Sequence, residues 1–136
     1  MANYVFKSLC IASLLLLCSC SSGSKLLADQ LVGQWQMAQI VQDGTNDVSA
    51  EHNPENNRFI LFNADQTFES GGDPYGKNTG TWRMDETSRE LFLNSDAGAE
   101  DDSYWIVSID GRTMNWQGAR FEFNKRFLIT HTRTEN

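Results

Sequence analysis

Side chains able to support catalysis or metal binding are few and widely separated in this sequence of 136 residues. The two histidines, His52 and His131, lie about eighty positions apart. Glu51 and Glu55 accompany His52, but a solvated loop is a better interpretation of this polar stretch than a metal site. His131 has the same strand parity as Ile129, which favours a structural histidine over a ligand.

The remaining polar motifs give no support for an enzyme. The run Glu100-Asp101-Asp102 lacks the ordered ligand spacing of a calcium-binding loop. Gly71-Gly72-Asp73 precedes no helical pattern and therefore predicts no phosphate-binding loop. The sequence also lacks the Gly-x-Ser-x-Gly motif of a serine nucleophile. We therefore expect a non-enzyme without catalytic residues, cofactor or metal.

All three cysteines, Cys10, Cys18 and Cys20, fall within the first twenty residues. The apolar run at 9–17 follows Lys7 and is typical of a signal peptide, since it is too short to span a membrane. Leu17-Cys18-Ser19-Cys20 resembles a bacterial lipobox, with an aliphatic residue three places before the modified cysteine and a small residue directly before it. The alternative is an ordinary secretory peptide.

The lipobox resemblance implies that residues 1–19 are a lipoprotein signal peptide and that Cys20 carries the lipid. The folded part then has no free thiol for a disulfide, a metal or catalysis. Removal of the first 19 of 136 residues leaves 117, which is enough for one domain. We expect a Ser/Gly tether and a short helical turn over 20–30, followed by a single domain over 31–136.

The composition is that of a globular domain, with 40% hydrophobic and 21% charged residues. The net charge of −7 argues against nucleic-acid binding, which needs clustered Lys and Arg. Short runs with period-2 alternation indicate strands, as where Gly80, Trp82 and Met84 share one face. Eight strands are predicted, at 33–42, 58–63, 66–71, 79–84, 90–94, 103–110, 113–117 and within 120–133, the last one long and bulged at Asn124-Lys125.

The connections between these strands alternate between long and short, apart from a modest turn before the last strand. In an up-and-down meander, alternate loops lie at the same end, so loops 43–57, 72–78 and 95–102 are expected to frame one mouth. Closure of the meander would remove both exposed sheet edges. The predicted fold is therefore all-β: an eight-stranded antiparallel up-and-down β-barrel with room for side chains or one small ligand.

Three short motifs resemble the lipocalin superfamily, in particular the lipocalin-like lipoproteins of Gram-negative bacteria. Gly33-Gln34-Trp35 is similar to the Gly-x-Trp signature of the first strand, and Gly80-Thr81-Trp82 to the fourth strand. Residues 62–68 resemble the family's hairpin between the second and third strands, although Gln66 stands where Gly is commoner. The resemblance implies that Trp35 packs at the closed end of the barrel against an arginine of the last strand. Because the eighth strand ends where the first begins, we expect this arginine to be Arg133 and not Arg126.

The resemblance also implies that the barrel holds a small apolar or amphipathic molecule. The candidate ligand-binding residues are Gln39, Val41, Phe59, Phe68, Tyr75, Trp105, Trp116, Phe121 and Phe123. Tyr75 and His52 are expected to act from the loops over the mouth. The inward face of the strand at 58–63 stays open, since both of its faces are apolar.

The alternative to a ligand-binding barrel is a lumen filled by aromatic side chains. Such a plugged barrel would act as a protein-interaction or inhibitor-type module that contacts an envelope protein. In either case the expected partner of the N-terminus is a membrane, reached through the lipid on Cys20. Ser21 in place of an acidic residue favours the outer membrane of a Gram-negative bacterium as the location.

Overall fold

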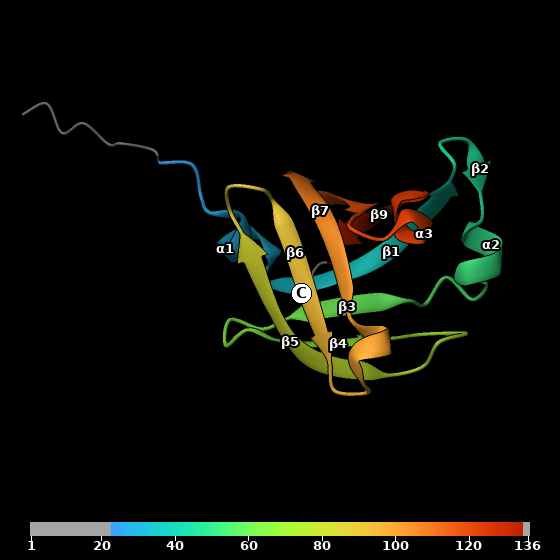
Figure 1. Cartoon of the computed structure of the whole chain (residues 1–136), viewed down its shortest axis with the longest axis horizontal. Coiled ribbons are helices and arrows are strands. Elements are labelled where there is room, and N and C mark those ends of the chain that lie inside the picture. The colour runs from blue at the N-terminus through green and yellow to red at the C-terminus, as the bar shows by residue number, and fades with distance from the viewer. Residues whose placement is uncertain (1–22, 135–136) are drawn as a thin grey trace, which may run out of the picture.

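The computed structural model describes residues 23–134, and within them the chain forms a closed antiparallel β-barrel (Figure 1). The barrel strands are β1 (Gly33–Gln42), β3 (Phe59–Phe62), β4 (Thr67–Gly71), β5 (Asn78–Asp85), β6 (Glu90–Ser95), β7 (Ser103–Asp110), β8 (Thr113–Gly118) and β9 (Phe127–Arg133). Each strand pairs with the next, and β1 pairs with β9, which closes the sheet into a barrel of eight strands. The predicted fold class is confirmed. The predicted signal peptide and Cys20 lie outside the described residues.

Five short elements decorate the barrel: α1 (Leu27–Leu31), β2 (Asn46–Asp47), α2 (Ser49–His52), the 3-10 turn η1 (Ala99–Asp101) and α3 (Glu122–Lys125). The helix α1 is the helical turn expected before the first strand. The backbone N–H groups of Leu27 and Ala28 donate to the Glu86 carboxylate at 2.9 and 2.8 Å, which ties α1 to the β5–β6 turn. The chain therefore enters the barrel from the end where β1 begins.

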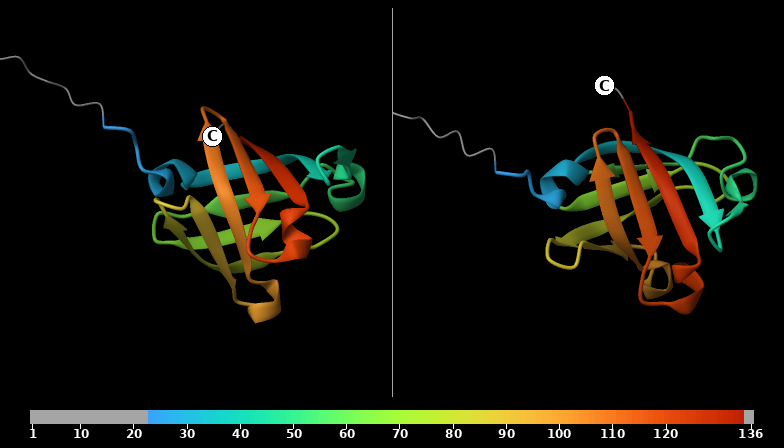
Figure 2. Two further views of the ribbon diagram at one scale, coloured as in Figure 1. Left: turned by 45° about the horizontal axis from the view of Figure 1, so that its top comes forward. Right: turned by 90° about the horizontal axis from the view of Figure 1, so that it is seen from above.

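The two ends of the barrel differ in the length of their connections (Figure 2). The short turns 63–66, 86–89 and 111–112 lie at the end where β1 begins, which we call the closed end. The long connections 43–58, 72–77, 96–102 and 119–126 lie at the other end, which we call the open end. The alternation expected from the sequence is thus complete, because the last connection is also long.

The last strand is shorter than the long, bulged strand predicted from the sequence. Residues 119–126 leave the sheet and form α3, and β9 begins only at Phe127. Arg120 has a left-handed φ of 63°, and the Gln117 side-chain amide donates to the backbone carbonyls of Lys125 and Phe127 at 2.7 and 3.1 Å. A Cβ on Gly118 would lie 1.8 Å from the Asn124 carbonyl oxygen, so only glycine permits this close approach.

A β-bulge in β1 changes which of its side chains face the interior. Met37 pairs with His131 and Gln39 with Thr130, so the register shifts at the residue between them. Before the bulge the odd-numbered residues Trp35 and Met37 face inward, and after it the even-numbered Ile40 does, at 2% exposed. Gln39 lies outside, where its amide donates to the Asp47 carboxylate at 3.0 Å.

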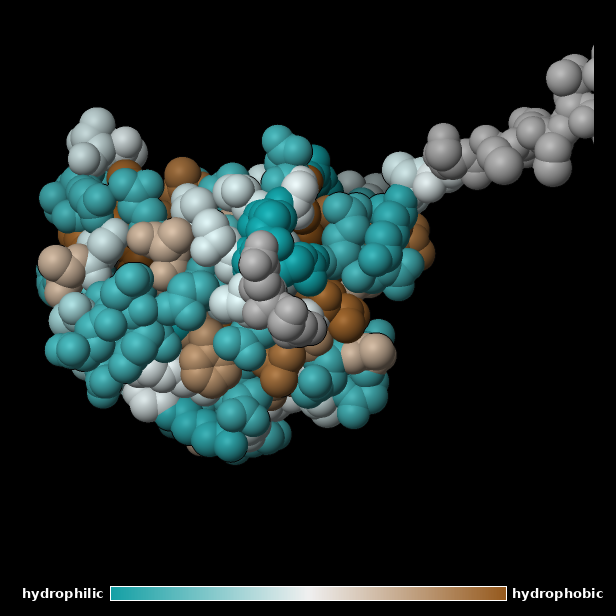
Figure 3. All heavy atoms as spheres, turned by 180° about the vertical axis from the view of Figure 1, so that it is seen from behind, coloured by the Kyte–Doolittle hydropathy of each residue, from teal (hydrophilic) through white to brown (hydrophobic). Residues whose placement is uncertain are grey.

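The outer surface of the barrel is mostly hydrophilic on the face shown in Figure 3, with apolar side chains in small groups. Among the described residues of the whole surface, the large apolar side chains that are exposed include Phe121 and Phe123, at 54% and 64%. No helix within residues 23–134 has the length and apolar character needed to cross a membrane.

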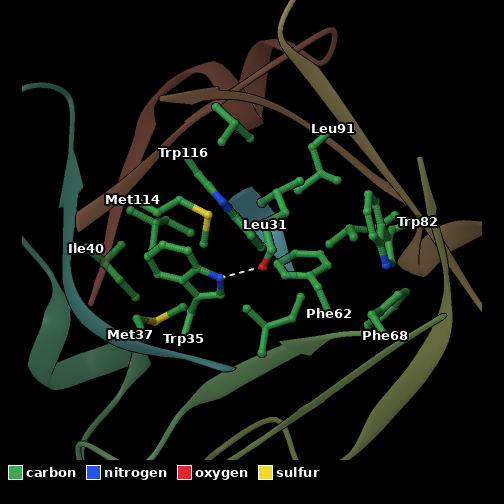
Figure 4. Packing of buried hydrophobic residues seen from close by; sticks show 14 of the residues in the cluster. Leu31, Trp35, Met37, Ile40, Phe62, Phe68, Trp82, Leu91, Met114 and Trp116 are labelled. Carbon is green, nitrogen blue, oxygen red and sulfur yellow. Dashed lines mark hydrogen bonds between the residues drawn. The ribbon is translucent and has the colours of Figure 1, made fainter. Parts of the chain in front are cut away.

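Large buried side chains pack against one another inside the barrel (Figure 4), and those of Leu31, Trp35 and Phe62 lie toward the closed end. Trp35 is fully buried, and its indole N–H donates to the Leu31 carbonyl at 2.8 Å. Ile60 and Phe62 supply the inward face of β3, which the sequence left undecided. Phe62 packs edge-on against Trp82 at 5.5 Å between ring centroids. The side chains at the closed end are therefore buried, and Leu31 of α1 packs against them.

Arg133 lies over Trp35, with its guanidinium carbon 4.1 Å from the ring centroid. Its side chain also donates to the carbonyls of Val32, at 2.8 Å, and Gln30. A Cβ on Gly33 would lie 2.6 Å from the guanidinium, which explains a glycine two places before the tryptophan. Arg126 instead pairs with Asp43 at 2.5 Å, at the open end.

Candidate functional site

The open half of the barrel contains a cavity of about 410 Å³. This volume falls in the range of small-molecule sites, roughly 300–1,000 Å³. Its apolar lining includes side chains from seven strands, namely Met37, Ile60, Phe68, Leu93, Trp105, Trp116 and Ile129. Aromatic side chains therefore fill the closed half of the lumen and leave the open half hollow.

Five of the nine candidate ligand-binding residues line this cavity: Phe59, Phe68, Tyr75, Trp105 and Trp116. The placement expected for the other four is wrong. Gln39 and Val41 lie beyond the bulge of β1 on its outward parity. Phe121 and Phe123 belong to the connection that carries α3 and pack outside against Tyr104 and Phe127.

Two loops meet over the mouth of the cavity. His52 Nδ1 and the Tyr75 hydroxyl lie 2.6 Å apart, and their rings stack with centroids 6.2 Å apart. The Arg58 guanidinium donates to the His52 carbonyl at 3.0 Å and lies 4.6 Å from the Tyr75 ring centroid. The residues proposed to act from the loops are thus in contact with each other, and Arg58 connects them to the barrel.

Arg58 is one of the cavity residues that the sequence analysis did not predict. Its carbonyl accepts a hydrogen bond from the Met37 N–H at 2.9 Å, and Met37 pairs with His131 on its other side. Arg58, Met37 and His131 therefore form one row across three neighbouring strands, and all three line the cavity. Arg58 alternates in step with Ile60 and Phe62, so the sequence pattern places all three side chains on the same face of the strand.

His131 lies on the inner face, as its parity with Ile129 indicated, and is 1% exposed. Burial, and to a smaller extent the positive charge of Arg58, lowers the pKa of His131 to about 3. The imidazole is therefore neutral at physiological pH. Its ring packs on Trp116 with centroids 4.4 Å apart.

Two buried polar atoms in this part of the barrel have no hydrogen-bond partner among the described residues: Trp116 Nε1 and His131 Nδ1. The other three tryptophans differ in this respect. The indoles of Trp35, Trp82 and Trp105 donate to Leu31, to Asn63 and Thr67, and to Ser103, respectively. An unpaired buried polar atom costs about 1–3 kcal/mol, so the packing of Trp116 against His131 carries an energetic cost.

The acidic run 100–102 spans the end of η1 and the residue after it, and its last member stabilises a loop. Asp102 accepts hydrogen bonds from the Ser95 backbone N–H at 2.8 Å and from the Asn94 amide, so it holds the β6–β7 connection in place. Across residues 23–134, no group of three or more His, Cys, Asp or Glu side chains is placed to hold a metal ion.

Comparisons with known proteins agree with this architecture. A crystal structure of a DUF4847 family protein from Bacteroides vulgatus superimposes with a TM-score of 0.55 at 16% identity, covering 78% of this chain and 95% of that one. No curated protein matches the sequence. Residues 31–116 match the family described as the lipocalin-like domain. The chain therefore belongs to the lipocalin-like domain family.

Proposed function

We propose that the barrel binds a small apolar or amphipathic molecule in the cavity of its open half. The observation that supports this function is the hollow space itself: about 410 Å³ lined by apolar and aromatic side chains with a few polar groups. Lipocalin-like domains are typically binding proteins and not enzymes, which agrees with this proposal.

Native mass spectrometry of the purified protein, before and after organic extraction, tests for a co-purified small molecule. The neutral fluorescent probe N-phenyl-1-naphthylamine provides an independent measurement of binding to the cavity. We expect its fluorescence to rise on binding and to saturate at one probe per protein. Absence of both a co-purified molecule and a saturable probe signal would contradict the proposed function.

A Ser70→Trp variant is expected to weaken probe binding at least about tenfold, because the new ring would occupy the cavity. Ser70 lines the cavity from β4. The matched control is Ser108→Trp, which places the same ring on the exposed outer face of β7. Equal probe affinity of the two variants, with both shown to be folded by circular dichroism, would place the probe outside the barrel.

We further propose that the protein is a lipoprotein anchored to a membrane through Cys20, in the cell envelope and most favourably at the outer membrane. The support is the Leu17-Cys18-Ser19-Cys20 motif after an apolar run of signal-peptide length. The described chain begins at Gly23 and reaches the barrel through α1 at the closed end (Figure 1). A lipid on Cys20 would therefore leave the mouth of the cavity directed away from the attachment point.

A Cys20→Ala variant is expected to lose lipidation completely when it is expressed in a Gram-negative host. Metabolic labelling with palmitate and intact-mass measurement would show an unprocessed chain without lipid. The matched control is Cys18→Ala, which leaves the modified cysteine in place and should be processed and labelled normally. Labelling of Cys20→Ala, or loss of labelling in Cys18→Ala, would show that the modified residue is not Cys20.

A further inference from the structure

We infer that the outer surface of β7, β8 and β9, together with the connection 119–126, binds a second copy of this chain. This surface is called the β7–β9 face below. The three strands lie side by side, and the connection with α3 lies at their open-end edge (Figure 2). The inference goes beyond the proposed function and does not depend on it, because the β7–β9 face lies outside the barrel.

Exposed apolar side chains gather on the β7–β9 face. Ile106 of β7 and Leu128 of β9 lie in one cross-strand row, with Gln117 of β8 between them. Phe121 and Phe123 follow on the connection between β8 and β9. Six large apolar side chains are exposed in the described chain, and these four belong to them. Such a concentration of exposed apolar side chains is typical of a surface that another molecule covers.

The charges on the β7–β9 face are few and mostly paired. Of the outward-facing residues of its three strands, all of them described, only Asp110 is charged, and it lies at the closed-end edge. The basic residues of the connection each have an acidic partner: Arg120 with Glu90, Lys125 with Glu122 and Arg126 with Asp43. The β7–β9 face is therefore nearly neutral, whereas the whole chain has a net charge of −7. Depletion of charged residues also characterises the core of protein interfaces.

This distribution of charge favours a second copy as the occupant. A two-fold interface places the same patch on both sides, so an unpaired charge near the axis would meet its own copy. The outward-facing Ser108, Asn115 and Gln117 both donate and accept hydrogen bonds, so these side chains can pair with their copies. Two chains of net charge −7 repel each other, and this repulsion is weakest across a nearly neutral face. A basic partner would instead be attracted to the acidic loops.

The position of the β7–β9 face on the side of the barrel suits a two-fold dimer. A two-fold axis parallel to the barrel axis would place both copies of α1 at one end and both cavity mouths at the other (Figure 2). Both N-terminal segments would then reach the same membrane, as the proposed lipid anchor requires. The cavity of each copy would stay open.

Photo-crosslinking of the full chain in a Gram-negative host tests this inference. The photoreactive amino acid p-benzoylphenylalanine would replace Ser108, which is exposed on β7. We expect an adduct of twice the mass of the chain, and mass spectrometry would identify both halves as this protein. The matched control places the same amino acid at Thr81, which is exposed on β5 outside the β7–β9 face.

A Leu128→Glu substitution in the Ser108 crosslinking chain is expected to lower the yield of this adduct at least about tenfold, because an unpaired carboxylate would be buried in the contact. The matched control is Thr81→Glu, which adds the same charge outside the β7–β9 face and should leave the yield unchanged. Ile106→Glu provides a second test should Leu128→Glu fail to fold, as judged by circular dichroism.

The salt dependence separates a second copy from a basic partner. In isolated envelopes, a rise from about 20 to about 500 mM NaCl is expected to increase the yield of the double-mass adduct, because salt screens the repulsion between two acidic chains. An adduct with a different protein, no adduct from position 108, or an equal yield from position 81 would overturn the inference. A yield that falls with salt, or that Leu128→Glu and Ile106→Glu leave unchanged, would overturn it as well.

Discussion

A Trp35→Ala variant is expected to have a free energy of unfolding about 3–5 kcal/mol lower than that of the wild-type protein. Trp35 is completely buried, and its removal would leave a cavity between α1 and the closed half of the barrel. It would also leave the Leu31 carbonyl without its donor and Arg133 without the ring beneath it. Chemical denaturation in urea, followed by circular dichroism, measures this loss.

The matched control for this prediction is Trp105→Ala. Trp105 is only partly buried and borders the existing cavity, so its truncation enlarges a hollow space that the fold already tolerates. We expect a smaller loss of stability than for Trp35→Ala. If Trp35→Ala unfolds at the same urea concentration as the wild-type protein, or costs no more than Trp105→Ala, the closed end is not held together by this residue.

The position of Trp35 and Arg133 shows what period-2 reasoning can establish. The predicted ranges 33–42 and 103–110 coincide with β1 and β7. An even number of strands in a meander places the end of the last beside the start of the first, and Trp35 does pair with Arg133. The strand ranges follow from alternation, and the choice of Arg133 over Arg126 follows from connectivity, whereas the contact between a tryptophan and an arginine was implied by the family resemblance.

The errors at Gln39 and Val41 have a different cause. A single extra residue in β1 reverses the faces of every residue after it, and the bulge is marked by neither Gly nor Pro in the sequence. Phe121 and Phe123 alternate as a strand would, but the backbone there turns through Arg120 in a left-handed conformation. Contacts between distant segments decide both cases, so local patterns do not predict them.

Arg58 is not among the residues predicted from the sequence, because the inward face of the strand at 58–63 stays open there. Its parity with Ile60 and Phe62 pointed inward once the face of β3 was known. The structure supplies that face through the pairing of β3 with β1, which places Ile60 opposite Trp35. The most informative residue of the candidate site therefore violates the hydrophobic pattern, as functional residues in a cavity often do.

Acidification from pH 7 to pH 4 is expected to destabilise the fold by about 3 kcal/mol through His131 alone. The imidazole has a pKa of about 3 in the folded protein against an ordinary value of 6.5. Below pH 6.5 the unfolded chain binds a proton that the folded chain does not, so the free energy of unfolding falls as the pH falls toward 3. The positive charge of Arg58 adds to the cost of protonation.

Urea unfolding at pH 7 and pH 4 measures this dependence, and a His131→Leu variant should lose most of it. Asp43, Asp47, Asp65 and Asp85 also contribute to acid sensitivity, because hydrogen bonds lower the pKa of each carboxyl group. Their stabilisation begins to be lost as the pH falls below about 5, so the comparison of wild type with His131→Leu, which keeps all four carboxyl groups, isolates the contribution of the histidine. Ile129→Val on the same strand controls for the effect of a core substitution and should keep the wild-type dependence. A His131→Leu protein that loses stability as steeply as the wild type between pH 7 and pH 4 would show that the buried imidazole is not the group that makes the barrel acid-sensitive.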